Sequence, residues 1–280
     1  MDILIGATDL YDYSKIKIWS ESIRQSNFDG DVVLLAYRLV NEPEIIYNCK
    51  KLKIDIIKCE YNNRGMPIVH NQMNRDTVCH QMRLFHAWQY LKQAEGIYEN
   101  VIFTDVKDIC FQSNPSEWLS QNAGFDIIAP SEGITYGNEP WNTENMINGY
   151  GPYIAQAASE YIVYNVGTIA GISKCMQELC LLLYTMGEGR YIPNDQSSFG
   201  LVANSPMFPR IRRTPMNDGW ACQCSTMFEP KNKHLEPFLL ESKPIIRDGQ
   251  VYTNDNKLCC LLHQYDRVDV LRAAIEERYK

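Results

Sequence analysis

The sequence predicts a single α/β domain whose sheet is mostly parallel and covered by helices on both faces. Apolar strands alternate with amphipathic helices through the first hundred residues, which is the pattern of parallel strands joined by crossover helices. Hydrophobic residues make up 45% of the chain and charged residues 22%, so a sizeable core can form. The length of 280 residues fits one large domain, and no repeat, low-complexity tract or linker divides it.

The first half supplies most of the expected sheet. Each expected strand is a short apolar run, and each expected helix carries apolar residues at helical spacing, as Met82, Phe85 and Leu91 do. The expected order is a strand at residues 2–7, a helix at 14–25, a strand at 32–37, a helix at 43–52, a strand at 54–59, a helix at 77–93 and a strand at 101–104.

The second half is less regular. Residues 133–152 are rich in Gly, Asn and Pro but also hold aromatic residues, so they indicate a long functional loop. The elements expected after it are a strand at 161–166, a helix opened by Ser173, a hairpin turn at Asp248-Gly249, a strand at 258–262 and a closing helix at 268–280.

Charge and cysteine usage exclude several classes of protein. The net charge of −7, without a run of Lys and Arg, argues against a broad nucleic-acid surface. The first residues, MDILIG, lack the basic region of a signal peptide, and no stretch reaches membrane length, so we expect a cytosolic protein. Most of the cysteines lie among apolar neighbours and indicate core thiols in a reducing compartment. Cys222 and Cys224 lack partners at zinc-ligand spacing.

The most informative segment is an apolar strand that leads directly into acidic residues. Residues 101–115 read VIFTDVKDICFQSNP, with Asp105 and Asp108 just after the strand. Ligands of open α/β sheets bind beyond the carboxyl ends of the strands, and carboxylate oxygens are good ligands for Mn²⁺ or Mg²⁺. A divalent cation there would stabilise the charge of a diphosphate leaving group. The plainer interpretation is a solvated acidic turn.

This segment resembles the metal-binding acidic motif of glycosyltransferases with the GT-A fold, in its TD-x-x-D-x-x-F-Q-x-x-P variant. Three further segments follow in the order those families show: NVGTIAG at 165–171, NDQ at 194–196 and HQYDR at 263–267. The resemblance implies a GT-A-like fold, which is a Rossmann-type mixed sheet flanked by helices. It implies one domain over residues 1–280, with a nucleotide-sugar donor half at 1–130 and an acceptor half at 131–280.

The resemblance also implies a metal site. Asp105, Asp108 and His263 would be the protein ligands of Mn²⁺ or Mg²⁺. A strict D-x-D pattern would place an acid at position 107, where this chain has Lys107. Either Asp105 and Asp108 form the acidic pair, or Lys107 supplies positive charge that a metal would otherwise supply. A plain edge histidine is the alternative interpretation of His263.

Six residues would then contact the nucleotide part of the donor. In similar enzymes the turn after the first strand holds the base and ribose, where this chain offers the Thr8 hydroxyl and the Tyr11 ring. Asp105 and Lys107 would lie near the ribose and phosphates. Arg83 and Arg267 would meet the phosphate oxygens, although each of these arginines is equally explained as a structural surface charge.

The remaining motifs would face the sugars. Asn165, Asp195 and Gln196 would line the donor sugar and carry the chemistry, while a helix N-cap is the alternative role for Asp195. An inverting enzyme needs a carboxylate base, for which Asp195 or Glu132 could serve, and a retaining enzyme does not need one there. The sequence leaves both open.

Aromatic residues in the second half are candidates for the acceptor cleft. Trp141, Tyr150 and Trp220 could pack on the C–H faces of a sugar, and burial in the core is their alternative role.

Together these features imply a glycosyltransferase that moves a sugar from a nucleotide diphosphate sugar, expected to be a UDP-sugar such as UDP-hexose or UDP-xylose, to a glycan acceptor. Similar free-standing enzymes build glycans in bacteria, protists and large DNA viruses. One alternative is a non-catalytic sugar- or nucleotide-binding protein. The other, a sugar nucleotidyltransferase, would carry a Gly-rich, Arg-containing loop after the first strand, which residues 6–9 lack.

Overall fold

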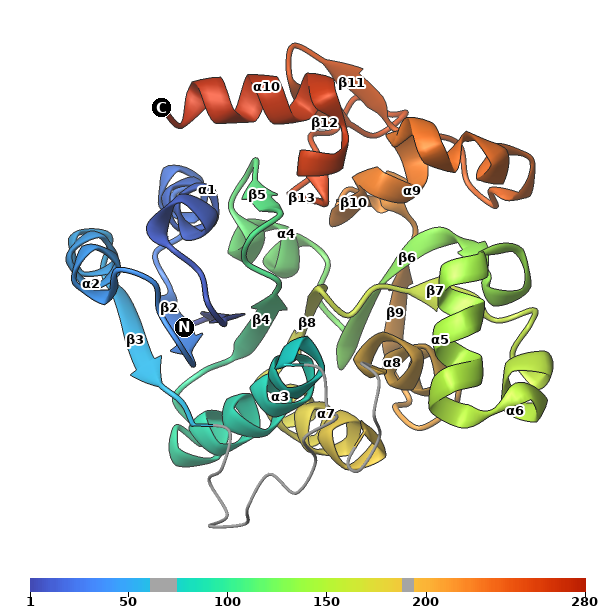
Figure 1. Cartoon of the computed structure of the whole chain (residues 1–280), viewed down its shortest axis with the longest axis horizontal. Helices are drawn as coiled ribbons and strands as arrows, with labels where there is room; N and C mark the ends of the chain where they lie inside the picture. Colours follow the sequence, from blue (N-terminus) through green and yellow to red (C-terminus); the bar gives the residue numbers. More distant parts are fainter. Residues whose placement is uncertain (61–74, 188–193) are drawn as a thin grey trace.

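A mixed sheet flanked by helices forms the body of the protein in the computed structural model, which describes residues 1–60, 75–187 and 194–280 (Figure 1). The spatial order of the strands is β3 (Ile54–Lys58), β2 (Asp31–Ala36), β1 (Ile3–Thr8), β4 (Asn100–Thr104), β8 (Thr168–Ile172), β6 (Ile127–Thr135) and β7 (Ile162–Tyr164), and β9 (Ile211–Thr214) also pairs with β6. The strands β3, β2, β1 and β4 are parallel, whereas β8 is antiparallel to β4 and to β6. This confirms the expected single α/β domain with a mixed sheet.

Helices cover both faces of this sheet because its strands are apolar on both sides. In β1, Ile3 and Ile5 pack with α3 (Arg75–Gln93) and α7 (Ser173–Gly187). Leu4 points the other way and packs with α1 (Tyr13–Gln25) and α2 (Glu42–Lys51). Figure 1 shows the two helix pairs on opposite sides of the sheet. Double-sided burial explains why the strands are continuous apolar runs.

A second, three-stranded sheet brings the end of the chain back to the acidic segment. Its order is β10 (Ala221–Gln223), β13 (Leu261–His263) and β5 (Ile109–Phe111). Because β5 follows β4 closely along the chain, residues 105–108 lie where the two sheets meet. In the register of β13 on β5, His263 lies opposite Ile109. This pairing places the histidine beside the acidic residues, although more than half of the chain separates them in sequence.

The prediction of a long loop at residues 133–152 is wrong. The strand β6 continues to Thr135, a 3-10 helix η1 spans Tyr136–Asn138, and the helix α5 spans Pro140–Tyr150. Pro140 fits the first turn of a helix, and the interior-facing side chains of α5 are buried, Met146 among them, so packing overrides a composition typical of loops. The strand expected at 161–166 ends early, at Tyr164, and β8 begins only after Gly167.

The smaller elements complete the chain. They are α4 (Pro115–Gln121), α6 (Pro152–Ala157), α8 (Asp195–Ala203), η2 (Met216–Asp218), α9 (Cys224–Phe228), η3 (Pro230–Phe238), β11 (Ile245–Arg247), β12 (Gln250–Tyr252), η4 (Tyr265–Arg267) and α10 (Asp269–Arg278). The turn expected at Asp248-Gly249 joins β11 and β12 as a hairpin. All ten cysteines are free thiols. Within the described ranges, no helix has both the length and the apolar character needed to cross a membrane.

Candidate active site

Two carboxylates and one imidazole converge where the two sheets meet. Asp105 follows β4, Asp108 precedes β5 and His263 ends β13. One ligand atom from each lies within 4.8 Å of the others. The Nε2 atom of His263 is 3.3 Å from Oδ2 of Asp105 and 3.8 Å from Oδ1 of Asp108. The imidazole is buried, whereas the carboxylates keep 27% and 17% of their side-chain surface exposed, so the cluster is reachable from solvent.

The imidazole ring of His263 is oriented by a hydrogen-bonded glutamine. Its Nδ1 atom donates to Oε1 of Gln223 at 2.7 Å, and Nε2 of Gln223 donates to Oγ1 of Thr168 at 3.1 Å, which fixes the amide. The ring therefore keeps its other nitrogen, Nε2, directed at the carboxylates, where this buried atom has no hydrogen-bond partner among the described residues. A metal-ligating histidine has this arrangement, because its second nitrogen donates to a protein oxygen.

The cluster combines two carboxylates with a single imidazole, and their surroundings shift the pKa of each group. Burial raises the pKa of Asp108, and the charge of Asp105 adds to that effect. Burial also acts to raise the pKa of Asp105, but the charge of the Arg83 guanidinium and the adjacent His263 imidazole outweigh it and hold that pKa well below its usual range. Burial opposes the charge of His263, yet the two aspartates raise its pKa. Two carboxylate oxygens and one imidazole nitrogen fit Mn²⁺ or Mg²⁺ in chemistry and in charge.

Arg83 joins this cluster to the helix α8. Its guanidinium, on α3, bonds to Asp105 and donates from Nη2 to Oδ2 of Asp195 at 2.8 Å. The residue is only 4% exposed, and His80 on the same helix places its Nδ1 atom 3.6 Å from the same Asp195 oxygen. Burial acts to lower the pKa of Arg83, but the charges of Asp105 and Asp195 raise it. Both terminal nitrogens thus engage carboxylates, and a phosphate contact by Arg83 stays a prediction.

Beside Asp195 lies a network of side-chain amides around a buried carboxylate. Asn165 donates from Nδ2 to Oε1 of Glu132 at 2.8 Å, and Gln196 donates from Nε2 to the same oxygen at 3.0 Å. Gln196 also donates to Oδ1 of Asn142, on α5, at 2.7 Å. Burial raises the pKa of Glu132 despite these donors. Asp195 joins this network at its Oδ1 atom, which accepts the backbone N–H of Gln196 at 2.9 Å, so the predicted sugar residues Asn165, Asp195 and Gln196 form one connected group.

The Asn165-Val166-Gly167 segment has a structural basis in this site. Asn165 accepts at Oδ1 from the backbone N–H of Gly167 at 2.8 Å, which forms the turn between β7 and β8. Gly167 in turn accepts the backbone N–H of Asp105 at 2.9 Å. A Cβ atom on Gly167 would lie 2.5 Å from Oδ2 of Asp105, so only glycine leaves room for this carboxylate.

The residues predicted to contact the nucleotide lie around the cluster without converging on one point. Thr8 ends β1, and its buried Oγ1 has no hydrogen-bond partner in the described parts of the chain. Tyr11 is half-buried, and its pKa is raised by burial and then by the charges of Asp105 and Asp108. Two more cations, Lys107 and Arg267, are exposed to solvent. Lys107 is 3.6 Å from Oδ2 of Asp266, and the exposed Arg267 donates to Ser225 at 3.4 Å.

Two of the proposed sequence roles are wrong. Trp220 does not face an acceptor cleft, because it is 0% exposed, donates its indole N–H to the backbone of Thr168 and packs against Trp118. Asp195 is not a helix N-cap, since Asn194 holds that position and Asp195 is the first residue of α8. Of the other aromatic candidates, Trp141 is 61% exposed, and the half-buried Tyr150 shares a hydrogen bond with Ser198 at 2.6 Å.

Sequence reasoning missed four polar residues of the site. They are Gln223, which orients His263; Asn142, which accepts from Gln196; Thr226, whose hydroxyl donates to Oε2 of Glu132 at 3.2 Å; and His80. None lies in a motif. Asn142 also fell in the segment that was expected to be a loop. Their roles depend only on partners far away in the sequence, which no local pattern reports.

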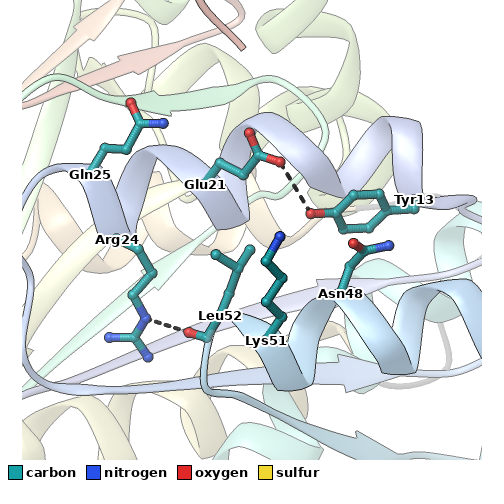
Figure 2. A pocket seen from close by; sticks show the side chains of 7 residues that line it. All are labelled: Tyr13, Glu21, Arg24, Gln25, Asn48, Lys51 and Leu52. Carbon is teal, nitrogen blue, oxygen red and sulfur yellow. Dashed lines mark hydrogen bonds between the residues drawn. The ribbon is translucent and has the colours of Figure 1, made fainter. Parts of the chain in front are cut away.

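A hollow on the described surface lies away from this site. It has a volume of about 440 Å³ between α1 and α2, and its lining includes Tyr13, Glu21 and Arg24 (Figure 2). Arg24 already donates from Nε to the backbone oxygen of Leu52 at 2.7 Å, and Tyr13 donates to Glu21 at 3.4 Å. None of the site residues lines it, so the candidate site is defined by convergent chemistry and not by the size of a cavity.

The fold is shared with solved glycosyltransferases. No protein-family model and no curated protein sequence matches the chain. Mouse xyloside xylosyltransferase 1 in its apo form superposes with a TM-score of 0.51 at 11% identity, covering 94% of this chain and 97% of that one. The galactosyltransferase LgtC, in complex with donor and acceptor sugar analogues, gives 0.50 at 11% identity over 94% and 86%. An LgtC active-site variant with glutamate for glutamine gives 0.52 at the same identity and coverage. This chain therefore has the GT-A-like fold of these glycosyltransferases.

Proposed function

We propose that this protein is a metal-dependent glycosyltransferase that moves a sugar from a nucleotide diphosphate sugar to a saccharide acceptor. The observation that carries the proposal is the convergence of Asp105, Asp108 and the orphaned Nε2 of His263 at the carboxyl end of β4. This is the end of the sheet at which α/β proteins bind their ligands. The fold is that of a galactosyltransferase and a xylosyltransferase, which supports a UDP-hexose or UDP-xylose as donor.

The metal would be Mn²⁺ or Mg²⁺, held by Asp105, Asp108 and His263. When bound, it supplies positive charge that stabilises the diphosphate leaving group. Gln223 keeps the histidine nitrogen directed at the cation, and Arg83 keeps the Asp105 carboxylate in place. Because Arg83 bonds to Asp105 and no lysine or arginine of the described residues bonds to Asp108, the second carboxylate provides the charge that a cation would balance.

The nucleotide would lie between the first strand and the acidic segment. Thr8 offers an unused hydroxyl there, and the Tyr11 ring lies near both aspartates, in reach of a base and ribose. Lys107 and Arg267 are the exposed cations on the outer side of the cluster, and we assign them to the phosphates.

The sugars would meet Asn165, Asp195 and Gln196. Both oxygens of Asp195 are engaged, one by Arg83 and the other by the backbone N–H of Gln196 at 2.9 Å. Both oxygens of Glu132 are engaged as well. These bonds favour binding and positioning roles for the two carboxylates over a role as proton acceptor. Trp141 is the exposed aromatic residue that we assign to the acceptor.

A non-catalytic sugar-binding protein is the principal rival, because Lys107 interrupts the strict D-x-D spacing. The observation against it is that the lysine pairs with Asp266 and leaves the three ligand atoms clustered. A sugar nucleotidyltransferase stays disfavoured by the residues after β1. The cytosolic location expected from the sequence stays a prediction.

The test is a donor screen. The protein is incubated with a panel of UDP- and GDP-sugars, Mn²⁺ and simple saccharide acceptors, and the released nucleoside diphosphate is measured with and without a chelator. Asp108→Asn should fold, because it removes a charge that burial disfavours, and it should lose at least about 100-fold in rate. The matched control is Asp29→Asn, an exposed aspartate. If the protein binds nucleotide but releases no nucleoside diphosphate from any donor, the result would favour the non-catalytic binding protein.

A further inference from the structure

The side-chain amide of Gln196 uses its nitrogen completely within the protein. Its two N–H groups donate to Oε1 of Glu132 at 3.0 Å and to Oδ1 of Asn142 at 2.7 Å. No donor among the residues that the structure describes bonds to its carbonyl oxygen, and the residue is only half-buried. The carbonyl oxygen is therefore the group that Gln196 has left to offer a ligand.

A chain of hydrogen bonds that begins at a backbone amide determines which way this glutamine points. The N–H of Gly167 can only donate, so Asn165 must present its oxygen there and its NH₂ group to Glu132. Glu132 can only accept while ionised, and Thr226 donates to its second oxygen. Gln196 must then also turn its NH₂ group toward Glu132, because the flipped amide would place two oxygens 3.0 Å apart.

We propose that Glu132 and Asn142 are positioning residues, which hold Gln196 so that its side-chain carbonyl oxygen and not its NH₂ group faces the reacting sugar. This inference rests on the proposed glycosyl transfer. A carbonyl oxygen accepts a hydrogen bond from a sugar hydroxyl and stabilises positive charge that develops at a sugar carbon, neither of which an NH₂ group can do.

The proposal gives Glu132 a role that differs from that of a catalytic base. A base must take up a proton, whereas a positioning residue needs only an acceptor oxygen at the same place. Glu132→Gln keeps one carbonyl oxygen for Asn165 and Gln196, and its new NH₂ group can donate to the hydroxyl of Thr226. Glu132→Leu removes both oxygens at similar volume. If Glu132 positions Gln196, the kcat of Glu132→Gln should be at least tenfold higher than the kcat of Glu132→Leu. If Glu132 acts as a catalytic base, the two variants should lose kcat equally.

The second variant tests Asn142. Asn142→Ala removes the acceptor for one N–H of Gln196 and should lower kcat by about 10- to 100-fold, the scale of a misplaced catalytic group, with donor KM changed by less than about threefold. The control is Asn148→Ala, an exposed asparagine on the same helix. Rates are expressed per nucleotide-binding site, counted by calorimetry with UDP and Mn²⁺, so that misfolded protein does not contribute.

Nuclear magnetic resonance tests the positioning independently of turnover. In protein with ¹⁵N-labelled glutamine side chains, the NH₂ signal of Gln196, assigned by its loss in Gln196→Met, should exchange slowly with water. Exchange should become at least tenfold faster in Asn142→Ala and Glu132→Leu. Fast exchange in the unmodified protein would overturn the proposal, as would equal kcat losses in both Glu132 variants. If no donor is turned over, the proposed function fails by itself, while the NH₂ signal still decides the positioning.

Discussion

Gln223→Leu should weaken metal binding without touching a metal ligand. The substitution removes the oxygen that accepts the Nδ1–H of His263 at 2.7 Å. Gln223 is 1% exposed and His263 is 2% exposed, so water cannot replace the lost acceptor. The imidazole then either keeps an unsatisfied buried N–H or moves its proton to Nε2, where the nitrogen can no longer bind a cation.

The two outcomes lead to the same magnitude. A buried donor without a partner costs about 1–3 kcal/mol. Loss of the outer partner of a metal-binding histidine typically costs about 10- to 100-fold in affinity, which corresponds to about 1.4–2.8 kcal/mol. We therefore expect Gln223→Leu to bind Mn²⁺ about 10- to 100-fold more weakly. Gln223→Glu keeps an acceptor at the same place and should bind more tightly than the leucine variant.

The assay is a titration with Mn²⁺ alone, in which free Mn²⁺ is followed by electron paramagnetic resonance at constant pH. Gln250→Leu serves as the control, because Gln250 lies in the β11–β12 hairpin, where its side-chain oxygen accepts a hydrogen bond from the hydroxyl of Tyr252 at 2.8 Å. If Gln223→Leu is folded and binds Mn²⁺ within about threefold of the unmodified protein, then His263 is not a metal ligand oriented by Gln223.

Three further predictions concern single side chains. Burial raises the pKa of Glu132, so the ionised carboxylate lowers the stability of the folded protein as the pH rises. Glu132→Gln should therefore raise Tm at pH 7. This gain should vanish below about pH 4.5, where the carboxyl group is protonated in both the folded and the unfolded state. Thermal unfolding between pH 4 and 8 measures this, and a gain that is the same at every pH would contradict it. Trp141→Ala should raise the acceptor KM by roughly fivefold, about 1 kcal/mol of stacking, and an unchanged KM would remove this residue from the acceptor site. Lys107→Ala should change the Kd of Mn²⁺ by less than about threefold, because its exposed pair with Asp266 at 3.6 Å is weak; a tenfold change in a Mn²⁺ titration would mean that the lysine acts on the cation itself.

The first half of the fold was predictable because its strands are buried on both faces. A strand such as β1, with every residue buried, must be a continuous apolar run, and the sequence displays that run directly. The helix α5 was not predictable in this way. Its Gly, Asn and Pro residues resemble a loop, and its helical state depends on packing by residues such as Met146 that only the folded chain defines.

The residues of the candidate site also differ in how far the sequence predicts them. Asp105, Asp108 and His263 could be predicted because each lies beside an apolar strand, with Asp105 after β4, Asp108 before β5 and His263 at the end of β13, in an order that resembles known enzymes. Gln223 and Asn142 could not, because an amide acquires its role only from its partner. These partners, His263 and Gln196, are 40 and 54 residues away along the chain.

The distribution of charge in the site connects its stability to its proposed chemistry. Among the residues that the structure describes, no lysine and no arginine other than Arg83 is buried. This one guanidinium bonds to two carboxylates, Asp105 and Asp195. Burial acts to raise both of their pKa values, yet both are lowered, that of Asp105 chiefly by Arg83 and that of Asp195 by His80 first and then by Arg83. Asp108 and Glu132 receive no such partner, and burial raises both of their pKa values. A fold selected for stability alone would replace such carboxylates with apolar residues. Their presence is explained if a cation balances the charge of Asp108 and if Glu132 is needed to orient Gln196.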